Sequence, residues 1–225
     1  PHAPEVWDGA VNLDASSRQV HLPDAPGIPG LVLRHFERDR DYPAIAELIS
    51  AVNLHDGVDW LPDAETVRNA WEHTEGLDLD EDVLLACLDG TPIGYVEHSW
   101  RIRGKKVLHE LQPMVRPEHR HRGLGRALLN WAEARVGRAL VAGGGGPVSL
   151  PHQLVGWADL EIPEVSPFAA AAGYRVRGYV VMMTRPLADP IPDRPLPAGL
   201  EVRPVRPEDH RRIWDADSEA FQDHR

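Results

Sequence analysis

Apolar residues along the middle of the chain follow two spacings, one typical of strands and the other of helices. Strands are indicated where apolar residues alternate or form short runs between turn residues, and helices where they recur at helical spacing. The predicted strands are residues 31–36, 83–88, 93–96, 105–115, 148–157 and 174–184. The predicted helices start at Asp41 and Asp63, follow Gly123 to about Val141, and cover residues 167–172. The predicted order is strand, two helices, three strands, helix, strand, helix and strand.

The two ends of the chain differ in composition from this middle part. Residues 1–29 are rich in proline, aspartate and glycine and are predicted to form an extended arm. Residues 186–198 are rich in proline and are predicted to form a stiff linker. These limits leave residues 30–185 as the main predicted domain.

A short internal repeat follows the linker. Gly199-Leu200-Glu201-Val202-Arg203-Pro204-Val205 resembles Gly30-Leu31-Val32-Leu33-Arg34-His35-Phe36, at an offset of 199 − 30 = 169 positions. Both copies continue into acidic residues and a helical pattern. A chance match is the alternative. The repeat predicts that residues 199–225 start a second copy of the domain, truncated after its first strand and helix.

Composition excludes several classes of protein. The net charge of −11 disfavours a nucleic-acid surface. No apolar run approaches the ~18 residues that a membrane span needs, and the N-terminus has no signal-peptide pattern. The single cysteine, Cys87, excludes an internal disulfide and suits a reducing compartment. We therefore expect a cytoplasmic protein that binds neither nucleic acid nor membrane.

The strongest chemical signal lies in residues 115–129. A strand ends at Val115, and an arginine- and histidine-rich turn then leads into two glycines that open a helix. The first N–H groups of a helix lack intrahelical partners and carry partial positive charge, so they bind phosphate well. The surrounding cations are Arg116, Arg120, Arg122 and Arg126. This combination predicts a site for a small anion, and a diphosphate fits it best.

The spacing of the glycines narrows the class of ligand. A Walker loop needs a lysine followed by serine or threonine, and neither pair follows these glycines. A dinucleotide fingerprint needs a third small residue where Leu128 stands. The remaining pattern is Arg120-x-x-Gly123-x-Gly125. An ordinary glycine-opened helix with a solvated basic turn is the alternative.

This pattern resembles the acetyl-CoA pyrophosphate loop of the GNAT N-acetyltransferase superfamily. The element order over about residues 31–185 also resembles the GNAT plan, which implies an α/β (α+β) fold with a mixed, mostly antiparallel sheet flanked by helices. The repeat resembles the two-lobed, mycothiol synthase-like members of the superfamily and implies a second GNAT lobe in cis. The resemblance implies acetyl-CoA as cosubstrate. Its expected contacts are Met114, Val115, Arg120, His121, Arg122, Gly123, Leu124, Gly125 and Arg126.

The resemblance also implies transfer of an acetyl group to a primary amine of a small-molecule acceptor. Such an amine has a pKa near 10 and is mostly protonated at neutral pH, so a base must remove its proton. In the family this base commonly lies on the strand before the glycine loop, which here carries His109 and Glu110. Strand alternation sends these two side chains to opposite faces. Glu110 is the favoured base and His109 the second, with a purely structural role open for each.

One departure from the family pattern concerns the leaving group. The family often has a tyrosine four residues before the glycine that ends the short helix, where it protonates the thiolate. Here that position is Ala169, four residues before Gly173. Tyr174 is the nearby substitute, although its position is normally part of the core. A non-catalytic lobe that binds acyl-CoA is therefore the alternative function.

Metal chemistry is not expected. The twelve histidines include no His-Glu-x-x-His motif and no Cys/His spacing typical of a metal site.

Overall fold

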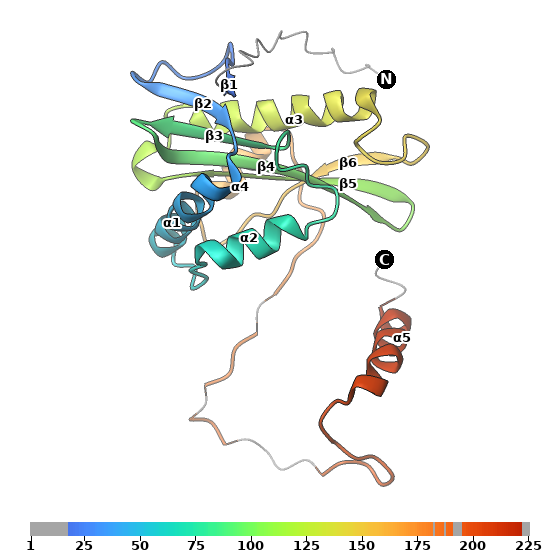
Figure 1. The fold of residues 1–225 in the computed structure, drawn as a ribbon. Helices are drawn as coiled ribbons and strands as arrows, with labels where there is room; N and C mark the ends of the chain where they lie inside the picture. Colours follow the sequence, from blue (N-terminus) through green and yellow to red (C-terminus); the bar gives the residue numbers. More distant parts are fainter. Residues whose placement is uncertain (1–17, 182, 187, 191–194, 222–225) are drawn as a thin grey trace. The chain divides into compact units, whose positions relative to one another are not determined.

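The computed structural model describes residues 18–221 except 182, 187 and 191–194 (Figure 1). The chain divides into two units, residues 1–174 and residues 175–225. This division falls eleven residues before the domain end predicted at residue 185.

A six-stranded sheet forms the centre of the first unit, with its strands in chain order from β1 to β6. Neighbouring strands are antiparallel except β5 and β6, which are parallel. The mixed, mostly antiparallel sheet predicted from the sequence is therefore confirmed. The strands are β1 (Gln19–Val20), β2 (Leu31–His35), β3 (Val83–Leu88), β4 (Thr91–Arg103), β5 (Lys106–Val115) and β6 (His152–Val155).

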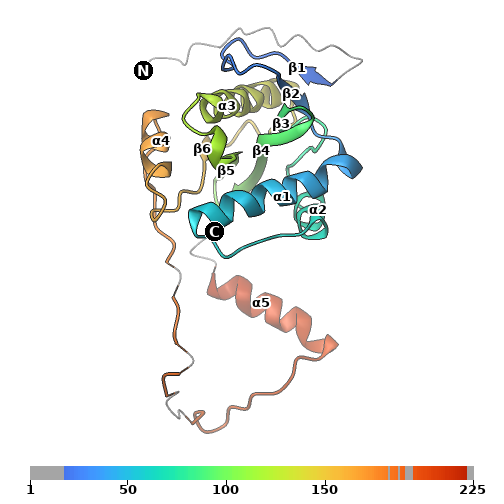
Figure 2. The same ribbon diagram turned by 90° about the vertical axis from the view of Figure 1, so that its left-hand side faces the viewer.

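Helices cover both faces of this sheet (Figures 1 and 2). One face packs against α3 (Leu124–Ala142), through a core that includes Leu84, Val96 and Leu111. The other face packs against α1 (Arg38–Asp56) and α2 (Ala64–Glu72), through a core that includes Phe36, Leu85 and Tyr95. A short helix, α4 (Val165–Ala171), follows β6. Because side chains alternate along a strand, each position of β4 and β5 can be assigned to one of the two faces.

Local signals explain where the helices begin and end. Asp63 caps α2 as predicted, because its carboxylate accepts a hydrogen bond from the Thr66 backbone N–H at 2.7 Å. Gly57 and Gly143 adopt left-handed conformations at the ends of α1 and α3. Helix α1 begins at Arg38, before the predicted start at Asp41.

The predicted N-terminal arm is partly a component of the sheet. Residues 1–17 lie outside the described part of the chain. Residues 19–20 form β1 and pair with β2, and the side chains of Val20 and Leu22 are buried in the core next to α3. The prediction of an extended arm is therefore wrong for this stretch, because its apolar residues are covered by the sheet.

The prediction of a final strand over residues 174–184 is also wrong for the residues of this range that the structure describes. Residues 175–181 form no strand, and the side chains of Val176, Val180 and Val181 are exposed. The alternating pattern gives these residues strand propensity, but a strand also needs a partner ladder. Within the described residues, β6 is the last strand of the sheet and has no neighbour beyond it.

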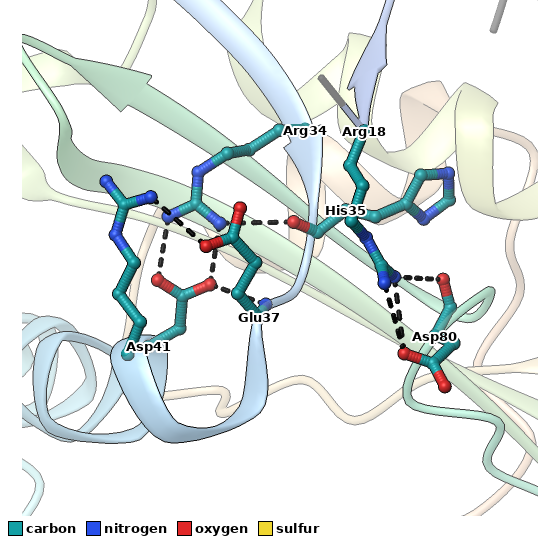
Figure 3. Close-up of polar contacts among 7 residues, drawn as sticks. Arg18, Arg34, His35, Glu37, Asp41 and Asp80 are labelled. Atoms are coloured by element: carbon teal, nitrogen blue, oxygen red, sulfur yellow. Dashed lines mark hydrogen bonds and ion pairs between the residues drawn. The ribbon is translucent and has the colours of Figure 1, made fainter. Parts of the chain in front are cut away.

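The second unit repeats one feature of the first, an arginine–aspartate pair at the start of a helix, which we call the arginine–aspartate corner. In the first unit the guanidinium of Arg34 donates two hydrogen bonds to the carboxylate of Asp41, at 2.6 and 2.7 Å (Figure 3). In the second unit Arg203 donates two to Asp209, at 2.6 and 2.8 Å. The two arginines are 203 − 34 = 169 positions apart, the offset of the sequence repeat.

The repeated corner extends to the backbone. Arg34 and Arg203 each donate also to the carbonyl of the following residue, at 3.1 and 3.2 Å. Each partner carboxylate accepts a further bond from a backbone N–H at the start of a helix. In the second unit this corner precedes η2 (Pro207–Asp209) and α5 (His210–Ala220). The strand predicted over 199–205 is not formed there.

Candidate active site

Strands β5 and β6 separate halfway along β5. Their pairing runs from Val107 opposite His152 to Glu110 opposite Val155, and it stops there. Residues 111–115 of β5 keep β4 as a partner and have no described strand on their other side. Backbone groups near Met114 and Val115 therefore lie on an open strand edge, and Pro113 has no N–H for a further ladder bond.

The open edge leads directly into the glycine loop. A single 3-10 turn, η1 (Pro117–His119), connects β5 to the loop, and Gly123 is the N-cap of α3. Gly123 has a φ of +86°, a left-handed conformation that favours glycine. No side chain caps this end of α3 in the described residues. The first N–H groups of the helix are therefore available to an anionic ligand.

The arginines around this loop differ in the protein contacts that their guanidinium groups already make. Arg120 forms a two-bond ion pair with Asp56 at 2.8 and 2.6 Å, and its Nε donates to the Val115 carbonyl at 3.2 Å. This differs from the role expected for Arg120, because its guanidinium already has protein partners. Arg126 lies over the ring of Phe168, 5.5 Å from its centre. Arg122 is exposed in the turn.

These contacts predict different effects for two arginines. Arg122→Ala should weaken acetyl-CoA binding roughly threefold, and the loss should shrink as salt increases, because exposed charges are screened. Arg120→Ala should instead lower the unfolding free energy by roughly 2 kcal/mol, because it leaves the mostly buried carboxylate of Asp56 unpaired. Calorimetry at two ionic strengths and denaturant unfolding measure the two effects. A salt-independent loss in Arg122→Ala would show that this side chain acts by packing.

The α1/α2 face of β4 and β5 carries two carboxylates. Tyr95 and Met114 pack in the core on this face, so strand alternation places Glu97 and Glu110 there too. Glu110 pairs with Arg101 at 2.5 Å. Oε2 of Glu97 is covered from solvent and has no hydrogen-bond partner in the part of the chain that the structure describes. Burial, and then the charge of Glu110, raise the pKa of Glu97 to about 7.

Sequence reasoning missed Glu97. Its signal was present, because it is a charged residue directly after the apolar strand segment that ends at Val96. Strand alternation alone could have placed it on the same face as Tyr95.

His109 lies on the opposite face, within a row of hydrogen-bonded rings. His98 Nδ1 lies 3.2 Å from Asp82 Oδ1, and His98 Nε2 lies 3.0 Å from His109 Nδ1. His109 Nε2 lies 2.8 Å from His152 Nδ1, and His152 Nε2 lies 3.2 Å from the carbonyl oxygen of Pro147. Both ring nitrogens of His109 are therefore occupied, and the ring is fully buried. His109 is a poor candidate for the base, since it faces away from Glu110.

Burial is the main cause that lowers the pKa of His109, to about 4, and the charges of His98 and His152 lower it further. A histidine whose folded pKa lies below its unfolded value of about 6.5 contributes stability above that pH and loses it as the pH falls toward 4. The unfolding free energy should therefore fall by roughly 3 kcal/mol between pH 7 and pH 4 from this residue. Denaturant unfolding across this range measures how the unfolding free energy depends on pH. This dependence should be weaker in His109→Asn than in the wild type. His121→Asn, a change at an exposed ring, should keep the wild-type slope, and equal slopes in all three proteins would contradict this assignment.

Tyr174 is not placed to protonate a leaving thiolate. Its ring packs beside the core under α3, and its hydroxyl donates to Glu133 at 2.9 Å. Burial and the neighbouring charge of Glu133 raise the pKa of Tyr174. The proposed catalytic role for Tyr174 is therefore corrected, because the hydroxyl is already engaged by a carboxylate on α3. Ala169 lies in α4 and supplies no hydroxyl.

The sheet with its separated strands and the glycine-opened helix form a fold similar to that of GNAT acetyltransferases. Residues 43–143 match the family model described as acetyltransferase (GNAT) family. Residues 43–143 are therefore similar in sequence to the GNAT family of acetyltransferases. The structure is similar to a GCN5-related N-acetyltransferase from Sphaerobacter thermophilus, with a TM-score of 0.64 and 26% identity over 86% of this chain and 59% of that chain.

Curated relatives are named mycothiol acetyltransferases. The protein from Salinispora arenicola is 37% identical over 111 residues, which cover 49% of this chain and 32% of the relative. The protein from Geodermatophilus obscurus is 30% identical over 186 residues, which cover 80% of this chain and 54% of the relative. The chain thus matches between about a third and a half of the length of these relatives. None of the described helices is both long and apolar enough to cross a bilayer.

Proposed function

We propose that the first unit transfers the acetyl group of acetyl-CoA to a primary amine of a small-molecule acceptor. The observation that carries this proposal is the open edge of β5, which leads directly into the uncapped start of α3. The edge offers backbone groups to an extended pantetheine arm, and the helix start offers N–H groups to a diphosphate. The diphosphate contacts are proposed from His121 to Arg126, with the N–H groups of Leu124 and Gly125 in the first turn.

The transfer requires one bond to form and one to break. The amine nitrogen attacks the thioester carbonyl carbon, the C–S bond breaks, and coenzyme A leaves as a thiolate that takes up a proton. We assign the removal of the amine proton to Glu110, on the α1/α2 face where β5 and β6 part. Its pairing with Arg101 fixes the carboxylate at this point of the sheet.

One observation favours a second function, an acyl-CoA-binding lobe without catalysis. Ala169 provides no acid for the thiolate, and Tyr174 is bonded to Glu133. Solvent can protonate the thiolate at neutral pH, because the pKa of an ordinary thiol, about 8.5, lies above that pH. The transferase therefore remains the first proposal.

The second unit is proposed to be the beginning of another GNAT lobe. The support is the repeated arginine–aspartate corner, in which the two arginines are separated by the offset of the sequence repeat. Intact mass spectrometry of the gene product tests this. A mass that accommodates two lobes is expected, whereas a mass of one lobe would contradict it.

A direct assay tests the transferase proposal. The protein is mixed with acetyl-CoA and a panel of primary amines, and thiol release is followed beside acetyl-CoA binding by calorimetry. Binding with amine-dependent thiol release is the expected result. Binding without release for every amine would favour the non-catalytic lobe, and absence of binding would overturn both functions.

A further inference from the structure

We propose that Glu97 binds the ammonium group of the acceptor, so that the accepted substrates are amines that arrive as cations. This inference rests on the proposed transferase function and specifies the acceptor site. It assigns to Glu97 the recognition of charge and leaves proton removal to Glu110.

The sheet register places the two carboxylates next to each other. Glu97 on β4 lies opposite Gln112, and Glu110 on β5 lies opposite Ser99. Glu97 and Glu110 are therefore diagonal neighbours on one face, at a spacing that side chains of this length can bridge. A cation held by Glu97 would lie beside Glu110, where the strands part.

The two carboxylates differ in what they already bind. Glu110 has a cationic partner in Arg101. Glu97 Oε2 is covered from solvent and has no donor among the described residues, which is costly for a carboxylate oxygen. An ammonium group supplies three N–H donors and a positive charge, which is what this oxygen lacks. Glu97 is therefore the unsatisfied member of the pair.

The charge balance of this face also favours a cation. The two carboxylates and the guanidinium of Arg101 beside them leave a net negative charge at this point of the sheet. Arg103 and Lys106 lie farther along the same face, where β4 turns into β5. Tyr95 lies two residues before Glu97 on the same face, and burial keeps it neutral by raising its pKa. The pKa of Glu97, raised to about 7, means that the carboxylate is charged above that pH and neutral below it. Ammonium binding should therefore weaken as the pH falls through 7.

Kinetics with an accepted amine test this division of roles. Glu97→Gln should raise KM for the amine roughly ten- to hundredfold, the effect of a lost charged hydrogen bond, while kcat stays within a fewfold of wild type. The wild-type KM should rise below about pH 7, and the KM of Glu97→Gln should not. Glu65→Gln, the same change at an exposed position on α2, serves as the control and should match wild type. An unchanged KM in Glu97→Gln would overturn the proposal.

A binding measurement on the wild-type protein separates this inference from the transferase function. Carboxyl resonances of ¹³C-glutamate-labelled protein are titrated with pH, in the presence of n-butylammonium or of its neutral analogue 1-butanol. Butylammonium should lower the pKa of the resonance that disappears in Glu97→Gln, and butanol should not. This result can be obtained even if no amine is acetylated. If butylammonium leaves that pKa unchanged, Glu97 binds no ammonium, whether or not the protein is a transferase.

Discussion

Gly123→Val is expected to abolish measurable acetyl-CoA binding while the protein remains folded. The valine side chain would occupy the space in front of the first turn of α3, where the diphosphate is proposed to bind. Within the fold there is room for it, because the nearest atom to a Cβ at this position is in Pro26, 3.8 Å away. The left-handed φ of Gly123 adds a conformational cost of roughly 1–2 kcal/mol.

The control for that cost is Gly143→Val at the other end of the same helix. Gly143 has a φ of +80° and open space around its Cβ position. Both variants should lose a similar amount of stability in denaturant unfolding, and only Gly123→Val should lose acetyl-CoA binding by calorimetry. If folded Gly123→Val binds as wild type does, the proposed diphosphate site is wrong.

Glu110→Gln should lower kcat/KM for amine acetylation by about a hundredfold or more. Glutamine keeps the shape of the side chain and an oxygen for Arg101, but it cannot accept the amine proton. Affinity for acetyl-CoA should barely change, because residue 110 lies on the paired part of β5, before the open edge. The deficit should narrow at high pH, where more of the amine is already neutral.

A pH series on wild type, Glu110→Gln and Glu65→Gln measures this effect. Coincident profiles for all three would show that Glu110 has a structural role. A large fall in kcat for Glu97→Gln, with none for Glu110→Gln, would exchange the two proposed roles. If the wild type and all variants bind acetyl-CoA but acetylate no amine, the alternative function is favoured. The alanine at position 169, in place of a tyrosine, then indicates a lobe that binds acyl-CoA without catalysis.

Sequence reasoning succeeded where a signal is local. The loop from Val115 to Gly125 and the helix start at Asp63 each depend on residues close together in the chain, and the structure contains both of them. The placement of His109 and Glu110 on opposite faces followed from strand alternation alone. The roles assigned to the site residues stay predictions.

The failures involve partners distant in sequence. Nothing near Arg120 indicates that Asp56, 64 positions earlier, holds its guanidinium. Nothing near Tyr174 indicates its bond to Glu133. The prediction of a final strand failed for a similar reason. Val180 and Val181 have strand propensity, but a strand also needs a neighbouring strand to pair with. Each of these outcomes is decided by packing between segments.

The rings of His98, His109 and His152 form a row between Asp82 and Pro147, and the number of ring protons that this row needs can be counted. Its four contacts need four ring protons if all are to be hydrogen bonds, and three neutral imidazoles carry only three. The fully bonded row therefore holds one proton more than three neutral rings supply. Successive proton transfers between the three rings would move positive charge from β6 through β5 and β4 to the Asp82 carboxylate. Only protons would change position.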